Sequence, residues 1–140
     1  MRVQDLGEFN LIERLAETVR EEAVATEQPA KPGFRLRLSI GDDAAAWDSP
    51  ATTSVLTSDT MVEGVHFDLE HIGWEDLGWK SMAINLSDIA AMGCTPLYSQ
   101  VILGLRGDLP VAGLVEMYRG MMDASSQHGC AIVGGDTVRS

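Results

Sequence analysis

The sequence predicts an α+β domain in which a mixed β-sheet is flanked by helices. Segments with helical periodicity alternate with segments of period-two alternation, and the order of the predicted elements is α-β-β-α-β-α-β. Prolines and glycines separate several of these segments. With 140 residues, of which 45% are hydrophobic and 22% charged, the chain is long enough for one globular core.

One helix and two strands are predicted in the N-terminal half. Apolar residues at three- and four-residue steps over 8–25 indicate an amphipathic helix, whose apolar face comprises Phe9, Ile12, Leu15, Ala16, Val19 and Ala23. The prolines and glycine of 26–33 indicate a surface loop. Alternation predicts a strand over 34–40 that ends at Asp42 and Asp43. A second strand is predicted over 53–57, and it leads into Ser58 and Asp59.

The C-terminal half is predicted to alternate between helices and strands. A helix over 74–92 ends at Gly93, and Asp88 lies opposite the centre of its apolar stripe. A strand over 97–105 and a helix over 111–128 follow, with Leu114, Tyr118, Met121 and Met122 on one helix face. A last strand through 131–133 runs into a polar end, Gly134-Gly135-Asp136-Thr137.

Composition excludes several classes of function. Lys and Arg number 10 against 21 Asp and Glu, so the net charge of −11 offers no basic surface for a nucleic-acid backbone. The apolar runs fall well short of the roughly 20 residues that span a bilayer. The first residues lack a signal-peptide apolar region, and we expect a cytoplasmic protein that does not associate with membranes. Cys94 and Cys130 have no metal-ligand spacing, which favours buried reduced thiols.

Acidic residues recur at four places in the predicted fold. Asp42-Asp43, Asp59 and Asp136 are each predicted at the end of a strand, beside glycine or hydroxyl residues, and Asp88 lies on a helix. Carboxylate and hydroxyl oxygens suit Mg²⁺, which proteins often share with substrate phosphates. Converging carboxylates without a cation would raise one another's pKa. Taken singly, each carboxylate could instead serve as a turn residue, a helix cap or a solvated surface group.

Several common catalytic patterns are absent from the sequence. There is no GxxxxGK[ST] run, no GxGxxG after a strand, no nucleophile elbow and no HExxH pair. Lys31 and Lys80 are the only lysines. A site that handles phosphate would therefore need metal cations for most of its positive charge. The Gly134-Gly135 pair fits either a bulge or tight turn, or a close approach of backbone N–H groups to a phosphate.

Five blocks, taken together and in order, resemble the thiamine-monophosphate kinase family of the aminoimidazole ribonucleotide synthetase superfamily. They are Gly7-Glu8-Phe9-Asn10-Leu11-Ile12, Ile40-Gly41-Asp42-Asp43-Ala44-Ala45, Thr57-Ser58-Asp59-Thr60-Met61-Val62-Glu63-Gly64-Val65-His66-Phe67, Ala83-Ile84-Asn85-Leu86-Ser87-Asp88-Ile89-Ala90-Ala91-Met92-Gly93 and Val133-Gly134-Gly135-Asp136-Thr137. The resemblance implies that residues 1–140 are an N-terminal domain that binds ATP and Mg²⁺, with the family's C-terminal domain absent from this chain. It also implies a homodimer in which the sheets of two such domains pair into a barrel.

The resemblance further implies which residues form the site. Several Mg²⁺ ions would be held by residues matching the family's ligands, namely Asp43, Thr57, Ser58, Asp59, Asp88 and Asp136. Ser58 stands where the family commonly has threonine, which keeps the hydroxyl. His66 would contact thiamine monophosphate, and Gly135, Asp136 and Tyr118 would contact ATP. A packed strand-end histidine remains the alternative for His66, and a plain core aromatic remains the alternative for Tyr118.

The implied reaction is transfer of the γ-phosphoryl group of ATP to thiamine monophosphate, giving thiamine diphosphate and ADP. It would proceed by in-line displacement without an enzyme nucleophile. Two alternatives stay open: a non-catalytic module for dimerisation or metal binding, and another ATP-using member of the superfamily. The isolated chain is expected to be inactive, because the family completes its sites with the C-terminal domain.

Overall fold

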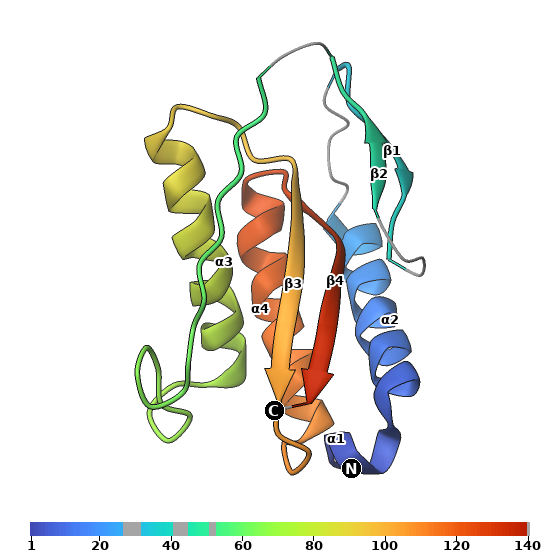
Figure 1. Cartoon of the computed structure of the whole chain (residues 1–140), viewed down its shortest axis with the longest axis vertical. Helices are drawn as coiled ribbons and strands as arrows, with labels where there is room; N and C mark the ends of the chain where they lie inside the picture. The colour runs from blue at the N-terminus through green and yellow to red at the C-terminus, as the bar shows by residue number, and fades with distance from the viewer. Residues whose placement is uncertain (27–31, 41–44, 51–52, 140) are drawn as a thin grey trace.

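The computed structural model describes residues 1–26, 32–40, 45–50 and 53–139. Within these ranges two helices and two strands are followed by alternating helices and strands (Figure 1). They are α1 (Val3–Leu6), α2 (Glu8–Thr26), β1 (Arg35–Leu38), β2 (Ala46–Asp48), α3 (Trp74–Ala91), β3 (Tyr98–Leu105), α4 (Val111–Gln127) and β4 (Ala131–Arg139). The α+β class predicted from the sequence is confirmed.

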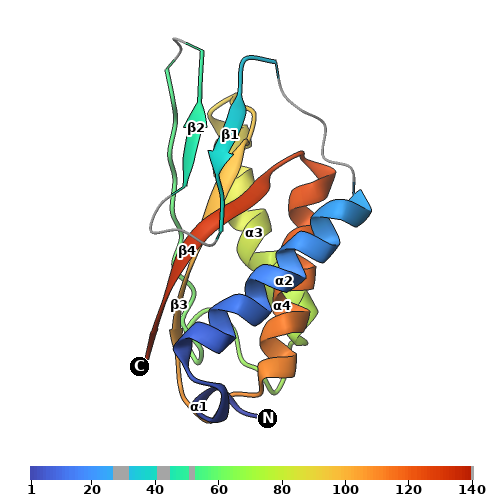
Figure 2. The same ribbon diagram turned by 90° about the vertical axis from the view of Figure 1, so that its right-hand side faces the viewer.

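Two small sheets take the place of one larger mixed sheet in the described chain. Strands β3 and β4 pair in parallel, with α4 as the connection between them, and β1 pairs with β2 in an antiparallel hairpin. The ring centroids of Trp47 on β2 and Tyr98 on β3 lie 5.0 Å apart, and this contact joins the hairpin to the parallel pair. The helices α2, α3 and α4 cover one side of the β3–β4 pair, as Figure 2 shows.

The core is built around α4, which contacts α2, α3 and β4. Apolar side chains at helical spacing on α4 are buried because they face neighbours on several sides. The predicted face is confirmed, since Leu114, Tyr118, Met121 and Met122 are all buried. The remaining core side chains come from α2, α3 and the parallel strands, and include Leu11, Leu15, Leu77, Met82, Leu103 and Ile132.

Two glycines let the backbones of α3 and α4 approach closely. A Cβ atom added to Gly120 would lie 1.9 Å from the carbonyl oxygen of Glu75, and one added to Gly78 would lie 1.8 Å from that of Met117. Any larger residue at either position would force the helices apart. The pair therefore fixes the position of α3, the helix that carries Asp88.

Several predictions about the first half of the chain are wrong. Residues 53–57 form no strand, and the second strand lies earlier, at β2. On α2, Phe9 is 85% exposed and Ile12 is 36% exposed, whereas Leu11 is buried. Leu15, Ala16 and Val19 of the predicted face are buried, so the buried face of α2 differs from the prediction only in the first turns, where Leu11 packs into the core in place of Phe9 and Ile12.

The last strand also differs from its prediction. Strand β4 continues to Arg139, so Gly134–Thr137 lie inside it and not beyond its end. The short helix α1 was not predicted; its first amides donate to the carbonyls of Leu109 and Gly107, at 2.9 and 2.8 Å. Cys130 is buried and Cys94 is half-buried. Across the described ranges, no helix is both long and apolar enough to cross a membrane.

Candidate functional site

The extended segment after β2 lies along α3 and is attached to it by side chains. Thr57 Oγ1 donates a hydrogen bond to Asp88 Oδ2 over 2.9 Å. Asp88 is exposed near the C-terminal end of α3, on the side away from the core, as predicted. The structure thus brings together Thr57 and Asp88, which are 31 residues apart in the chain.

Asn85 is a residue of this site that the sequence did not single out. Its Oδ1 accepts the backbone N–H of Asp59 over 3.0 Å, and its Nδ2 donates to the carbonyl of Ser81 over 3.0 Å. Asn85 precedes Asp88 by one helical turn, and that i, i+3 spacing is the sequence signal that could have found it. Thr57 and Asp59 are thus attached to α3 by different groups, Thr57 through its hydroxyl and Asp59 through its backbone N–H.

His66 lies in a tight turn beside the N-terminal half of α3. Gly64 adopts φ 77°, a conformation that favours glycine, and its N–H donates to the carbonyl of Phe67 over 2.8 Å. His66 Nδ1 accepts the N–H of Val62 over 3.1 Å. In the neutral ring the proton therefore resides on Nε2, which is a hydrogen-bond donor.

Two cations attach this turn to the body of the domain. Lys80 Nζ, on α3, donates to the carbonyl of His66 over 2.8 Å. Arg106, just after β3, bonds Glu63 Oε2 over 3.0 Å and Asp108 Oδ1 over 3.2 Å. His66 itself is exposed, so its imidazole can meet a ligand while its backbone is held.

The Gly134-Gly135-Asp136 sequence lies in the paired strand. Pairing with β3 passes from Ser99↔Ile132 to Gln100↔Gly134, so a bulge falls just before the two glycines. A Cβ atom on Gly135 would lie 1.9 Å from the carbonyl oxygen of Val101, which requires glycine there. Asp136 is exposed, and its Oδ1 accepts the N–H of Thr137 over 2.8 Å.

Tyr118 lies in the core, with 7% of its surface exposed. Burial raises the pKa of Tyr118 to about 12 because the phenolate would lose its hydration. A contact between this ring and ATP would require the ring to leave the core. Its burial thus agrees with the alternative of a core aromatic.

The oxygen donors along α3 have the chemistry of a site for a hard cation. Thr57, Asp59 and Asp88 offer hydroxyl and carboxylate oxygens, which Mg²⁺ prefers, and Ser58 is exposed between Thr57 and Asp59. In the described ranges, no Lys or Arg forms an ion pair with Asp59 or Asp88. The same ranges contain no group of three or more His, Cys, Asp or Glu side chains placed to hold one metal ion. Asp43, the further predicted ligand, lies outside the described residues.

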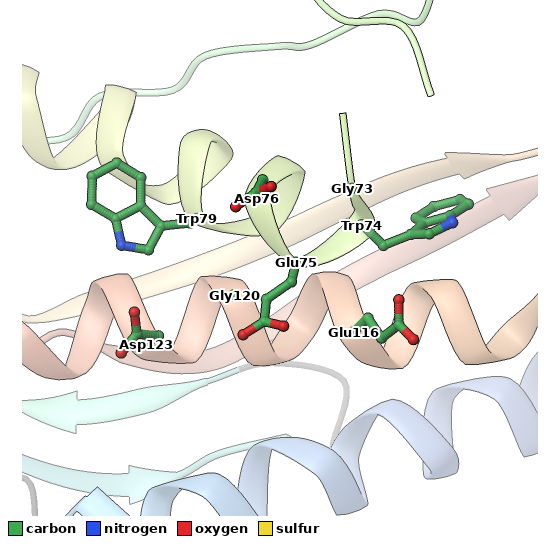
Figure 3. A pocket seen from close by; sticks show the side chains of 8 residues that line it. All are labelled: Gly73, Trp74, Glu75, Asp76, Trp79, Glu116, Gly120 and Asp123. Carbon is green, nitrogen blue, oxygen red and sulfur yellow. The ribbon is translucent and has the colours of Figure 1, made fainter. Parts of the chain in front are cut away.

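A surface crevice of about 370 Å³ opens elsewhere, between the first turns of α3 and the middle of α4. Its acidic side chains come from both helices, with Glu75 and Asp76 on α3 and Glu116 and Asp123 on α4 (Figure 3). None of the metal-, ATP- or substrate-binding residues predicted from the sequence lines this crevice. The candidate site is therefore the surface along α3 and not this crevice.

The chain is similar to known thiamine-monophosphate kinases. It is 41% identical over 101 residues to the thiamine-monophosphate kinase of Synechococcus elongatus, covering 71% of this chain and 31% of the relative. The crystal structure of thiamine-monophosphate kinase from Stenotrophomonas maltophilia K279a superposes with a TM-score of 0.69 at 36% identity, covering 96% of this chain and 39% of that one.

A structure of AaThiL complexed with AMPPCP and TMP superposes with a TM-score of 0.58 at 30% identity, covering 100% of this chain and 40% of that one. The chain thus spans well under half the length of these relatives. Residues 41–140, more than half of the chain, match the family described as AIR synthase related protein, N-terminal domain. Because this match covers more than half of the chain, the chain belongs to the AIR synthase related family.

Proposed function

We propose that this chain is the nucleotide- and metal-binding part of a kinase that phosphorylates thiamine monophosphate at the expense of ATP. The observation that carries the proposal is the attachment of Thr57 and Asp59 to α3 beside Asp88. The chain is similar over its whole length to AaThiL, whose structure was determined with AMPPCP and TMP. Since the chain spans 40% of that relative, the complete reaction is proposed for a longer protein.

The proposed metal ligands are the oxygen donors near α3, together with Asp43 and Asp136. Thr57, Ser58, Asp59 and Asp88 supply the chemistry that Mg²⁺ prefers. Bound Mg²⁺ would neutralise phosphate charge, which an acidic chain with net charge −11 would otherwise repel. In this proposal, Thr57 keeps Asp88 oriented until the ion is bound, because the hydroxyl hydrogen bond holds one carboxylate oxygen.

On the acceptor side, His66 is proposed to contact the phosphate of thiamine monophosphate. The hydrogen bond from Val62 to Nδ1 leaves Nε2–H as the donor of the neutral ring, and a phosphate oxygen is a suitable acceptor. On the nucleotide side, Gly135 and Asp136 are proposed to meet ATP. We retain Tyr118 as an ATP contact only as an expectation from the family resemblance, against which its burial counts.

The reaction proposed is direct in-line transfer. An oxygen of the acceptor phosphate attacks the γ-phosphorus of ATP, the bond to the bridging oxygen of ADP breaks, and no covalent enzyme intermediate forms. The residues of the chain act by holding the two phosphates in line and by limiting their repulsion. Catalysis of this kind depends on fixed geometry, which the bonds between the segment and α3 support.

A second copy of the chain is the proposed partner. Large apolar side chains stay exposed on the parallel strands, with Ile102 at 74% and Val138 at 50%, and Leu56 in the segment after β2 is exposed at 95%. Exposed apolar surface of this kind favours association, and pairing of the sheets into a barrel would cover it. A cytoplasmic location is proposed with the function, because ATP is supplied there. Sedimentation that gives only monomer would contradict the homodimer.

The decisive experiment measures binding of AMPPCP and thiamine monophosphate to the chain by titration calorimetry in the presence of Mg²⁺. It then incubates the chain with ATP, Mg²⁺ and thiamine monophosphate and measures thiamine diphosphate by chromatography. Binding of both ligands without product supports a binding domain whose catalysis needs the rest of a longer protein. Association without ligand binding would instead favour the non-catalytic module. Nucleotide binding that thiamine monophosphate never influences would favour another ATP-using member of the superfamily.

A further inference from the structure

The segment of residues 57–66 is held by side chains of α3, in addition to the ion pair between Arg106 and Glu63 and the packing of Met61 against the core. In the described chain this segment forms no regular strand, so a β-ladder does not fix its backbone. Three side chains of α3 bind it instead: Lys80 at the His66 carbonyl, Asn85 at the Asp59 amide, and Asp88 at the Thr57 hydroxyl. Of these three, Asp88 is already a proposed metal ligand, and the other two have no assigned role.

We propose that Asn85 and Lys80 are positioning residues that serve different halves of the site. Asn85 holds the backbone of Asp59 on the helix that carries Asp88, and so positions the residues proposed to bind metal and nucleotide. Lys80 holds the turn that carries His66, and so positions the residue proposed to bind thiamine monophosphate. The inference rests on the proposed function, because it takes Asp59 and His66 as the groups that meet the ligands.

The geometry suits Asn85 to this task. Its amide is bonded at both ends, accepting from Asp59 at 3.0 Å and donating to the Ser81 carbonyl at 3.0 Å, so the Oδ1 atom has a defined direction. The side chain of Asn85 is half-buried. A bond to the main chain of Asp59 orients the carboxylate without occupying its oxygens, which leaves them for a cation.

Lys80 acts at a separate point. It precedes Asn85 by five residues, which places its Cα about 7.5 Å away along the helix axis. Its ammonium group reaches the His66 carbonyl at 2.8 Å, while the imidazole is bonded through Nδ1 to Val62. The main chain and the ring of His66 are thus both held. Sites at this separation without shared partners act nearly independently, so removing one contact leaves the other in place.

The test compares Asn85→Ala and Lys80→Met, with Ser87→Ala as the matched control from the exposed part of the same helix. Titration calorimetry measures AMPPCP binding in the presence of Mg²⁺, and then binding of thiamine monophosphate to the loaded chain. We expect Asn85→Ala to weaken the first step by roughly 10- to 100-fold, as removal of a group that orients a metal ligand does. We expect Lys80→Met to weaken only the second step, by about tenfold, and Lys80→Arg to restore it.

Equal weakening of both steps by both variants would overturn the proposal, because it would indicate general loss of structure. Unchanged binding in Asn85→Ala would overturn it as well. Asn85→Ser provides a second variant with the same expectation where Asn85→Ala is unfolded.

A measurement without ligand separates this proposal from the proposed function. Hydrogen exchange at the Asp59 amide, followed by NMR, is expected to accelerate in Asn85→Ala and to stay unchanged in Lys80→Met. Wild-type chain that binds neither ligand would contradict the proposed function in this chain, while accelerated exchange would still support the role of Asn85. Unchanged exchange in Asn85→Ala would overturn that role whatever the ligands do.

Discussion

Replacing Gly120 by alanine tests the helix packing that places the candidate site. The added Cβ would lie 1.9 Å from the carbonyl oxygen of Glu75 and 2.9 Å from the amide nitrogen of Trp79. Ordinary contact begins at 3.4 Å. The backbones of α3 and α4 would therefore have to separate by roughly 1.5 Å at this point, because neither obstacle is a flexible side chain.

The expected magnitude follows from two opposing effects. Overpacking of a dense core costs about 1–3 kcal/mol and sometimes more. Alanine is better than glycine inside a helix by about 1 kcal/mol, which offsets part of that cost. Because a shift of roughly 1.5 Å between backbones exceeds what side-chain rotation can absorb, we expect the cost at the upper end. The net loss in free energy of unfolding is then about 2 kcal/mol.

Urea denaturation followed by far-UV circular dichroism measures this loss. The matched control is Gly104→Ala on β3, where an added Cβ meets no atom within 4 Å. We expect the control to change the free energy of unfolding by less than about 0.5 kcal/mol. A Gly120→Ala variant more stable than wild type by about 1 kcal/mol would follow helix propensity alone, and would refute the close packing of α3 on α4.

Two further substitutions test the core and the site. Since burial raises the pKa of Tyr118 from 10.0 to about 12, the unfolded chain loses this proton first, and stability falls as the pH rises from 10 towards 12. At pH 12 the loss in free energy of unfolding is roughly 2 kcal/mol, and Tyr118→Phe is expected to remove it. Chemical denaturation between pH 10 and 12 measures this; if the free energy of unfolding fell equally with pH in wild type and Tyr118→Phe, the burial of the Tyr118 hydroxyl would be contradicted. Below pH 10, weaker AMPPCP binding by Tyr118→Phe would support the ATP contact over the purely core role. Thr57→Val removes the hydrogen bond to Asp88 and is expected to weaken Mg²⁺-dependent AMPPCP binding by roughly tenfold. The control is Thr53→Val, at an exposed position. Equal AMPPCP affinities for the two variants would count against a role of the Thr57–Asp88 hydrogen bond in the site.

Helices α3 and α4 and strand β3 were predictable because their signals are local. Helix α3 begins at Trp74 as predicted and ends one residue before the predicted end at Met92, and Gly93 adopts φ 66° there. The buried face of α4 follows from apolar spacing alone. Asp88 was placed correctly by the helical angle, because that angle depends only on position within the helix.

The errors arise where tertiary partners decide the structure. Residues 53–57 contain β-branched and apolar residues that favour a strand, but in the described chain they pair with no strand, and Thr57 is attached to α3 through Asp88. Strand β2 is too short for a periodic signal, and it depends on β1 and on the contact of Trp47 with Tyr98. Gly134 and Gly135 were predicted beyond the last strand, but they lie inside it, because the bulge that their composition allowed falls just before them and Gly135 packs closely on β3.

The candidate site was predictable in its residue types and only partly in its assembly. The acidic and hydroxyl residues stood out in the sequence, and the structure brings Thr57, Asp59 and Asp88 to one helix. Asn85 escaped notice because an amide between apolar helix residues carries no distinct signal until its partner is known. The orientation of His66 was equally hidden, since it depends on the turn at Gly64 and on Lys80.

The central claim is that this chain alone carries a magnesium-dependent nucleotide site along α3. Titration calorimetry with AMPPCP, with and without Mg²⁺, tests it most directly on wild-type chain and Asp88→Asn. The account predicts binding by wild type only with Mg²⁺, and loss of most of that binding in Asp88→Asn while the thermal melt stays unchanged. Binding that ignores Mg²⁺ or the substitution, or no binding by wild type in either condition, would contradict it.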